Sequence, residues 1–179
     1  MKKIILYGIG ILAVVALIVM YVMRQANVPP QQVVSGGSIY KNAVYTIDGN
    51  PVQLVDGTAS TEAAPGSASK ITTQYFGNEV RGDLNGDGLE DVAFLFTQNS
   101  GGSGTFYYVA AALGSDKGYI GTNAVLLGDR IAPQTTEFRD GEVMVNYADR
   151  APGEPMTAKP SVGVSKYLKI LNGALVVAR

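Results

Sequence analysis

The chain contains no cysteine and no histidine. Without cysteine it cannot form a disulfide, use a thiol nucleophile or carry a lipid on a cysteine side chain. Without histidine it cannot build a Ser-His-Asp relay or a histidine-ligated zinc or iron site. A metal ion bound to this chain must therefore be held by oxygen atoms, which favours calcium or magnesium.

Charged residues are also few, with 14 basic and 15 acidic side chains in 179 residues. Three of the basic residues, Lys2, Lys3 and Arg24, flank an apolar segment that contains no acidic residue. The remainder of the chain is therefore mildly acidic and shows no basic patch. Proteins that bind nucleic acid need such a patch to neutralise phosphates, so we expect no nucleic-acid partner.

One long hydrophobic run is present, because Ile4–Met23 contains only apolar, glycine or tyrosine residues. As a helix it would span about 30 Å, the thickness of the hydrocarbon core of a bilayer. We expect residues 1–26 to be an uncleaved membrane anchor with its positive end in the cytoplasm. The alternative is a cleaved signal peptide followed by secretion. Residues 27–38 are polar and rich in proline and glycine, which predicts a linker.

Residues 39–179 are typical of strands joined by tight turns, and we expect them to form a single β-rich domain outside the cytoplasm, periplasmic or extracellular. Asp140-Gly141 and Asn172-Gly173 each separate two segments rich in apolar and β-branched residues. Both dipeptides favour hairpin turns, since the central residues of those turns need positive φ. A further hairpin is expected around Asp48–Pro51.

Two segments, Val92–Phe96 and Phe106–Leu113, are apolar on both faces. Such strands are expected to be central and covered on both sides, and the glycine-rich Asn99–Gly104 between them favours antiparallel pairing. The predicted fold is mainly β, an antiparallel sandwich or a rolled barrel. The alternative is an α+β fold with one short helix, since Asn123–Gly128 suits either a strand or a helical turn.

One loop carries the spacing of a metal site. Counting from Asp83, positions 1, 3, 5, 7 and 9 are Asp83, Asn85, Asp87, Leu89 and Asp91. Four of these residues offer side-chain oxygens and Leu89 offers its carbonyl, while Gly88 at position 6 allows a sharp turn. This spacing predicts one structural calcium ion. Position 12 is Phe94, which departs from the EF-hand pattern, and a metal-free turn is the alternative.

The same loop, GDLNGDGLED, resembles the DxNxDGxxD loops of integrin-type FG-GAP repeats. That resemblance implies calcium held by Asp, Asn, Asp, a backbone carbonyl and Asp before a strand. Over about residues 39–171 the chain also resembles a group of small bacterial exported or membrane-anchored proteins of unassigned function, through YTIDG, PGSASK, GDLNGDG, GGSGTFYYVAAAL, GTNAVLLGDRIAPQ, NYADRAPGEPM and PSVGVSKYLK. The second resemblance implies an envelope location and supplies no mechanism.

Three other sets of residues are candidates for function. Asp129-Arg130 and Asp149-Arg150, with Glu154, form either a polar site or structural charge contacts. The acidic residues that a hydrolase would use are Glu137, Glu142, Asp149 and Glu154. A sugar-binding surface would draw on Tyr40, Tyr45, Tyr107, Tyr108, Tyr119, Tyr147 and Tyr167, although tyrosine is also common in strands.

The function we expect is that of a membrane-anchored, non-catalytic envelope module. It would bind a protein, peptide or glycan and be stabilised by one calcium ion. The alternatives are a carboxylate-based hydrolase of envelope polysaccharide and an accessory subunit of a membrane complex.

Overall fold

The computed structural model describes residues 39–179. The predicted anchor and linker, residues 1–38, lie outside the described residues. Within the described part, no helix has the length and apolar character needed to cross a membrane.

The described residues form twelve β-strands and one short 3-10 helix, η1. Their bounds are η1 Ile39–Asn42, β1 Val44–Ile47, β2 Asn50–Gln53, β3 Thr58–Glu62, β4 Lys70–Gly82, β5 Asp91–Asn99, β6 Phe106–Ser115, β7 Gly118–Gly121, β8 Val125–Asp129, β9 Ala132–Arg139, β10 Glu142–Asp149, β11 Val162–Leu171 and β12 Ala174–Val177. The prediction of a mainly β fold is confirmed, and the α+β alternative is wrong.

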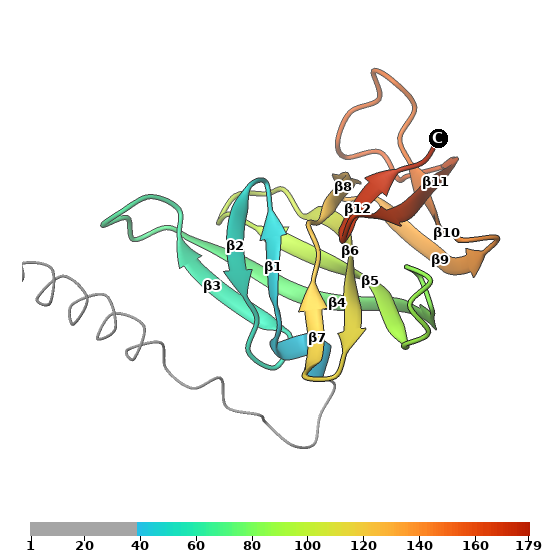
Figure 1. The fold of residues 1–179 in the computed structure, drawn as a ribbon. Helices are drawn as coiled ribbons and strands as arrows, with labels where there is room; N and C mark the ends of the chain where they lie inside the picture. Colours follow the sequence, from blue (N-terminus) through green and yellow to red (C-terminus); the bar gives the residue numbers. More distant parts are fainter. Residues whose placement is uncertain (1–38) are drawn as a thin grey trace, which may run out of the picture. The chain divides into compact units, whose positions relative to one another are not determined.

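The strands form three sheets (Figure 1). The largest has the order β3-β4-β5-β6-β7, with β8 also paired to β6. The second has the order β12-β11-β10-β9, and the third is the β1-β2 hairpin. Every ladder between neighbouring strands is antiparallel. The sheets do not close on themselves, so the rolled-barrel alternative is wrong.

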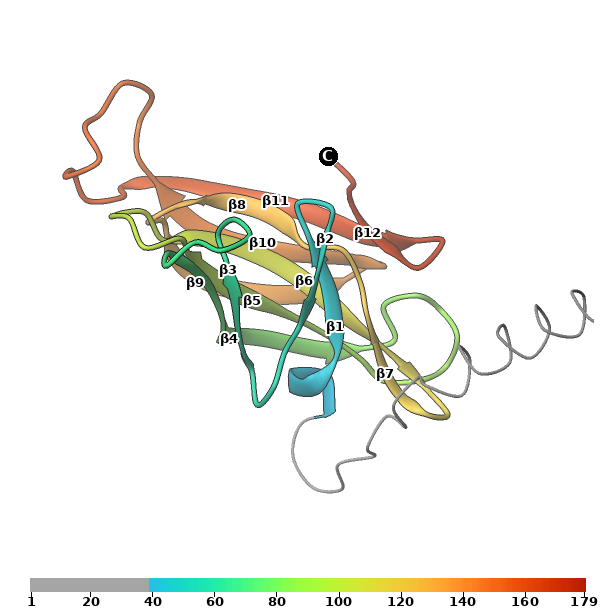
Figure 2. The same cartoon turned by 90° about the vertical axis from the view of Figure 1, so that its left-hand side faces the viewer.

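The three sheets stack as layers, with the six-stranded sheet in the middle (Figure 2). Alternation along β5 and β6 sends successive side chains to opposite faces. Toward the four-stranded sheet point Ala93, Leu95, Val109, Ala111 and Leu113. Toward the β1-β2 hairpin and η1 point Val92, Phe94, Phe96, Tyr108, Ala110 and Ala112.

The two segments predicted to be central are neighbours in the middle sheet. Val92 lies opposite Ala112 and Phe96 lies opposite Tyr108 in the antiparallel ladder. Both segments are buried on both faces, as their doubly apolar sequence predicted. They therefore form the layer between two hydrophobic cores, one on each face of the middle sheet.

The hairpin turns follow the sequence closely. Asp140-Gly141 has φ of 55° and 76°, and Asn172-Gly173 has φ of 51° and 76°. The first hairpin differs in length, because its turn is the two-residue Asp48-Gly49 and not the four residues Asp48–Pro51. Asn50 and Pro51 begin β2, where Pro51 lies opposite Thr46.

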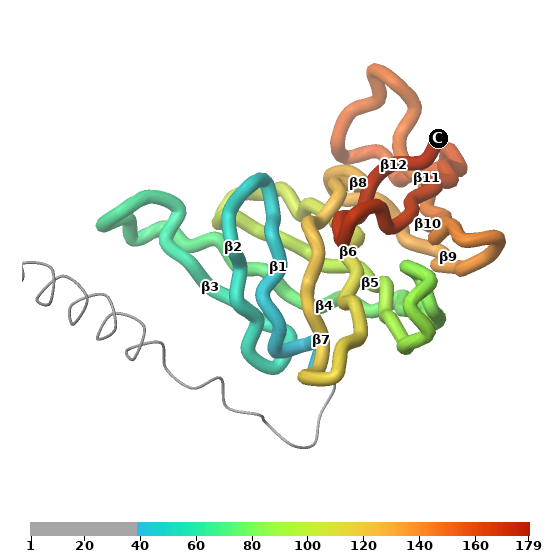
Figure 3. Tube along the Cα trace, in the orientation of Figure 1, coloured from blue at the N-terminus to red at the C-terminus, as the bar shows by residue number. Residues whose placement is uncertain are grey.

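The longest connections between strands are residues 63–69, 83–90 and 150–161, which can be followed along the tube in Figure 3. Residues 83–90 connect β4 to β5 and, together with Asp91 at the start of β5, carry the calcium-type spacing. Gly82, just before them, lies under the ring of Phe138 in β9, and a Cβ atom at Gly82 would be 2.9 Å from that ring. The loop thus begins where β4 packs against the four-stranded sheet.

Candidate functional site

The seven tyrosines named as a sugar-binding surface do not gather on one surface. Tyr40, Tyr45, Tyr108 and Tyr147 are buried in the two cores. Tyr107, Tyr119 and Tyr167 are partly exposed. Of these, Tyr167 lies on the outer face of the four-stranded sheet, where no other layer of the domain covers it.

The outer face is defined by alternation along β10. Val143, Val145 and Tyr147 point into the core between the sheets. The intervening residues Glu142, Met144 and Asn146 therefore point outward. In the ladder, Met144 lies between Tyr167 of β11 and Glu137 of β9, so these side chains share the outer face.

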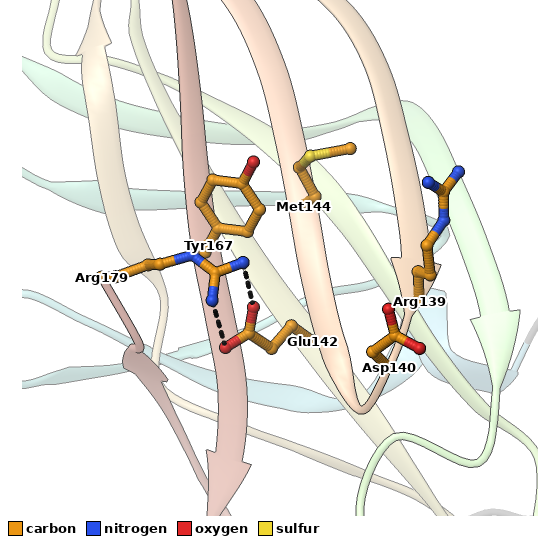
Figure 4. Close-up of a pocket in the computed structure, with 6 residues that line it drawn as sticks. All are labelled: Arg139, Asp140, Glu142, Met144, Tyr167 and Arg179. Atoms are coloured by element: carbon orange, nitrogen blue, oxygen red, sulfur yellow. Dashed lines mark hydrogen bonds and ion pairs between the residues drawn. The ribbon is translucent and has the colours of Figure 1, made fainter.

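A depression of about 390 Å³ lies at one end of this outer face. It is lined by Arg139, Asp140, Glu142, Met144, Tyr167 and Arg179 (Figure 4). The Tyr167 ring and the Met144 thioether form its apolar part, and the charged groups surround them. Five of these six residues belong to β9, β10, β11 or the β9–β10 turn, so the lining is carried mainly by the sheet.

Arg179 lies in the depression against two strand-borne groups. Its Nη2 atom is 2.9 Å from the Oε2 atom of Glu142. Its guanidinium carbon is 4.1 Å from the centroid of the Tyr167 ring. The cation is thus held by a carboxylate on one side and an aromatic face on the other.

Next to the depression, polar side chains form a row of hydrogen bonds across the sheet. Ser165 donates to Asn146 Oδ1 at 2.6 Å, and Asn146 Nδ2 donates to Thr135 Oγ1 at 2.9 Å. Thr135 donates to Glu137 at 3.2 Å, and Arg139 is paired with Glu137 at 3.2 Å. These bonds fix the polar groups in defined positions on an exposed surface.

The four acidic residues named for a hydrolase are not assembled into a catalytic pair. Glu137 and Glu142 are on the outer face, and each is bound to an arginine. Asp149 accepts a hydrogen bond from the Arg150 amide at 2.7 Å, and Glu154 accepts one from the amide of Ala151 at 2.8 Å. The last two therefore organise the start of the 150–161 loop.

The two Asp-Arg dipeptides make structural contacts. Arg150 donates to the carbonyl oxygens of Asp129 at 3.2 Å, Arg130 at 3.1 Å and Ala158 at 2.8 Å. Asp129 pairs with Arg130 at 3.0 Å and accepts a hydrogen bond from the Thr105 amide. Burial raises the pKa of Asp129, but these hydrogen bonds outweigh burial and hold it below its usual value. The contacts join the 150–161 loop to the β8–β9 turn.

In the calcium-type loop, Asp83 acts as the acceptor around which the backbone folds. Its Oδ1 atom accepts hydrogen bonds from the amides of Gly86 at 2.7 Å and Asp87 at 3.0 Å. Its Oδ2 atom accepts one from the amide of Gly88 at 3.0 Å. Gly86 and Gly88 have φ of 84° and 88°, which a residue with a side chain rarely adopts.

The other two exposed side chains of this loop that carry oxygen atoms, Asn85 and Asp87, contact each other. Asn85 Nδ2 donates to Asp87 Oδ2 at 2.9 Å, and the Leu89 amide donates to Asp87 Oδ1 at 2.8 Å. N–H groups therefore face the carboxylate of Asp87. A bound cation would take the place of these N–H groups beside the carboxylate.

Asp91 differs from the other residues of the loop because it is fully buried. Its two carboxylate oxygens accept hydrogen bonds from the amides of Leu84 at 2.9 Å and Gly114 at 2.8 Å. Burial raises the pKa of Asp91, and the amide hydrogen bonds oppose that rise. Asp91 therefore ties the loop to the end of β6.

The oxygen donors of the loop suit calcium in chemistry, since carboxylates and amide oxygens are its usual ligands. Within residues 39–179, however, no three His, Cys, Asp or Glu side chains converge closely enough to hold a metal ion. The hydrogen bonds inside the loop also complete it as a turn. The residue types therefore suit calcium, but in this structure the loop carboxylates accept backbone and side-chain N–H groups and do not converge on one point.

A second polar cluster links this loop to η1. Glu79 Oε2 accepts hydrogen bonds of 2.7 Å from the hydroxyls of Tyr40 and Tyr75. Arg81 pairs with Glu79 at 3.2 Å and with Glu90, the last residue of the loop, at 2.9 Å. Burial raises the pKa of Glu79, but the hydrogen bonds outweigh it and lower the pKa overall. The charged and hydroxyl groups of this cluster bind one another, and they stabilise the contact between the loop and η1.

Sequence reasoning did not single out Arg139, Asp140, Met144 or Arg179. The alternation along β10 indicated that Met144 points away from Val143 and Val145, but it gave no reason to prefer that face. The contact between Arg179 and Tyr167 depends on the order of β10, β11 and β12, which the sequence does not state.

None of the protein-family models, curated protein sequences or solved structures compared with this chain matches it.

Proposed function

We propose that this protein is a membrane-anchored, non-catalytic module of the cell envelope that binds its ligand on the outer face of the four-stranded sheet. The observation that supports this most is the depression around Tyr167 and Met144. An aromatic and a thioether side chain within a polar rim are typical of protein and peptide binding surfaces. The row of fixed polar groups beside it would give a glycan or peptide hydrogen-bonding partners.

The hydrolase alternative has less support. A glycosidase needs one carboxyl group free to protonate the leaving group and a second one facing the same bond. Glu137 and Glu142 are each bound to an arginine, and Asp149 and Glu154 cap backbone amides. The surface therefore favours binding over hydrolysis.

The proposed location rests on the sequence. Ile4–Met23 is long enough to span a bilayer, and Lys2 and Lys3 favour a cytoplasmic N-terminus. We propose a single-pass anchor with residues 39–179 outside the cytoplasm. Protease added to cells whose cytoplasmic membrane is exposed tests this location, since residues 39–179 should be digested, and without protease the full chain should stay with the membrane. A chain released from the membrane without its N-terminal apolar segment would favour the cleaved signal peptide instead.

We also propose that one calcium ion stabilises the domain, held by Asp83, Asn85, Asp87, the Leu89 carbonyl and Asp91. The oxygen-only donor set and its spacing support this assignment. The loop leads directly into β5, whose residues line both cores. Fixing the loop would therefore hold the start of the central strand, which is a structural role.

The binding proposal is tested by capture from the membranes of the source cells. The full chain is compared with a Met144→Ala/Tyr167→Ala double variant and with a Val55→Ala control. Val55 is exposed and lies outside the four-stranded sheet, so its loss should leave capture unchanged. We expect the double variant to lose the captured ligand. Equal capture by all three proteins would refute the outer face as the binding site.

A further inference from the structure

We infer that the depression between β10 and β11 recognises the side-chain guanidinium of an arginine on a partner polypeptide. This inference rests on the proposed binding function and names the ligand chemistry of the same face. It is drawn from the position of Arg179, whose guanidinium lies in the depression between Tyr167 and Glu142.

The two groups around this guanidinium are those that a cation needs. The Tyr167 ring offers its negative face at 4.1 Å from the guanidinium carbon. Glu142 offers a carboxylate whose two oxygens lie 2.9 and 3.5 Å from the two terminal nitrogens of Arg179. Paired contacts of this kind match the planar fork of a guanidinium better than the point charge of a lysine.

The carboxylate and the aromatic ring of this contact are carried by strands, whereas the guanidinium belongs to a residue outside any strand. Glu142 opens β10 and Tyr167 lies in the middle of β11, whereas Arg179 lies two residues beyond the end of β12 at Val177. The Glu142 side chain is 24% exposed and that of Arg179 is 65% exposed. A well-positioned site thus holds an exposed side chain that exchanges easily, because exposed ion pairs are individually weak.

The rim provides a second negative group. Asp140 lies on the β9–β10 turn beside the depression and makes no ion pair with another described residue (Figure 4). Together with Glu142 it would offset the charge of an incoming arginine once Arg179 has left. Arg139 is already paired with Glu137, so it competes little for these two carboxylates.

Arg179 accordingly acts as an internal competitor. The affinity for an external arginine is reduced by the fraction of molecules in which Arg179 occupies the site. Removing Arg179 should therefore strengthen binding of an external arginine, whereas removing Glu142 or Tyr167 should weaken it. A merely structural ion pair predicts neither change.

The test is a titration of the full chain in detergent micelles with two peptides, followed by NMR of labelled tyrosine rings. One peptide is acetyl-Gly-Arg-Gly-amide, and the other replaces arginine by citrulline, which has the same shape without the charge. We expect the arginine peptide to shift the Tyr167 signal at millimolar concentration, and the citrulline peptide not to. Arg179→Ala should tighten the apparent Kd at least about threefold.

Matched variants complete the design. Glu142→Gln should weaken arginine-peptide binding to Arg179→Ala by about two- to fivefold, the range for the loss of one exposed ion pair. Glu62→Gln, at the end of β3, should leave it unchanged. Equal binding of the two peptides, no binding of either to Arg179→Ala, or no effect of Glu142→Gln would overturn the inference. If the captured membrane ligand still depends on Tyr167 in that case, the proposed function stands while the arginine inference fails.

Discussion

The hydroxyl of Tyr108 donates a hydrogen bond of 2.9 Å to the Oδ2 atom of Asp48, 60 residues earlier in the chain. Tyr108 belongs to the central strand β6, and Asp48 forms the turn of the β1-β2 hairpin. The bond thus fixes the smallest layer of the fold onto the middle sheet. Hydrogen bonds to charged groups contribute about 1.5–3 kcal/mol to stability, and because Asp48 is exposed to water this bond belongs at the low end of that range.

Replacing Tyr108 by phenylalanine should therefore lower the free energy of unfolding by about 1–2 kcal/mol, because Asp48 loses its partner. Urea denaturation of wild type and Tyr108→Phe measures the difference. Tyr167→Phe is the control, since the Tyr167 hydroxyl makes no hydrogen bond within the described residues. The control should change stability by less than about 0.5 kcal/mol. Equal loss in both variants would contradict the role assigned to the Asp48 bond.

The same bond makes stability depend on alkaline pH. Burial, the hydrogen bond to Asp48 and the charge of Asp48 raise the pKa of Tyr108 from 10.0 to about 12. A raised pKa in the folded state favours the protonated phenol, so this contribution is complete below pH 10 and is lost as pH rises through 12. We expect stability to fall over this interval, and to fall less in Tyr108→Phe. Parallel pH profiles of the two proteins would refute this assignment.

Gly121 is the glycine whose replacement should be most damaging. A Cβ atom there would lie 2.2 Å from the carbonyl oxygen of Val44 and 2.7 Å from the ring of Tyr45. The backbone of β1 would have to move, so Gly121→Ala should cost about 1–3 kcal/mol. Gly163 in β11 has open space around its Cβ position, and Gly163→Ala is the matched control. Thermal melts of both variants test this difference, and equal Tm values would contradict it.

Calcium should raise the melting temperature of residues 39–179, which contain both cores. For an extracellular-type Kd of about 10⁻⁴–10⁻³ M, millimolar calcium would add about 0.4–1.4 kcal/mol. Magnesium should add less, because it demands a stricter octahedral shell. The measurement is a melt with calcium, with magnesium and with chelator.

Asp87→Ala should remove the calcium increment, because it deletes one of the exposed loop carboxylates. Asp116→Ala, in the exposed β6–β7 turn, should keep it. A wild-type melt that calcium leaves unchanged would mean that the loop is a metal-free turn. The hydrogen bonds that Asp83 accepts from three amides would then explain its acidic residues.

Much of the fold was predictable because local signals and global structure agree. Asp140-Gly141 and Asn172-Gly173 adopt positive φ at both residues, which few other dipeptides do without strain. The doubly apolar β5 and β6 needed cover on both faces and have it. No comparable local signal marks β4, whose long, largely polar run contains two irregularities around Gly77 and Asn78.

The candidate binding face was harder to predict, because its residues are ordinary surface types. Tyr167 was one of seven candidate tyrosines, and the strand order decides that its side chain lies on the outer face, whereas Tyr45 and Tyr147 are buried. Glu142 was considered as a catalytic acid, but it pairs with Arg179 from the segment beyond β12. Such a contact depends on tertiary arrangement, which no local pattern carries.

The central claim is that the ligand lies on the outer face of the four-stranded sheet. The most direct measurement places a photo-crosslinking amino acid at position 144 or at position 55 of the full chain and irradiates intact cells. Met144 lines the depression, whereas Val55 is exposed between β2 and β3. The account predicts a discrete adduct from position 144 that is absent from position 55. Adducts from position 55 alone, or the same adducts from both positions, would contradict it.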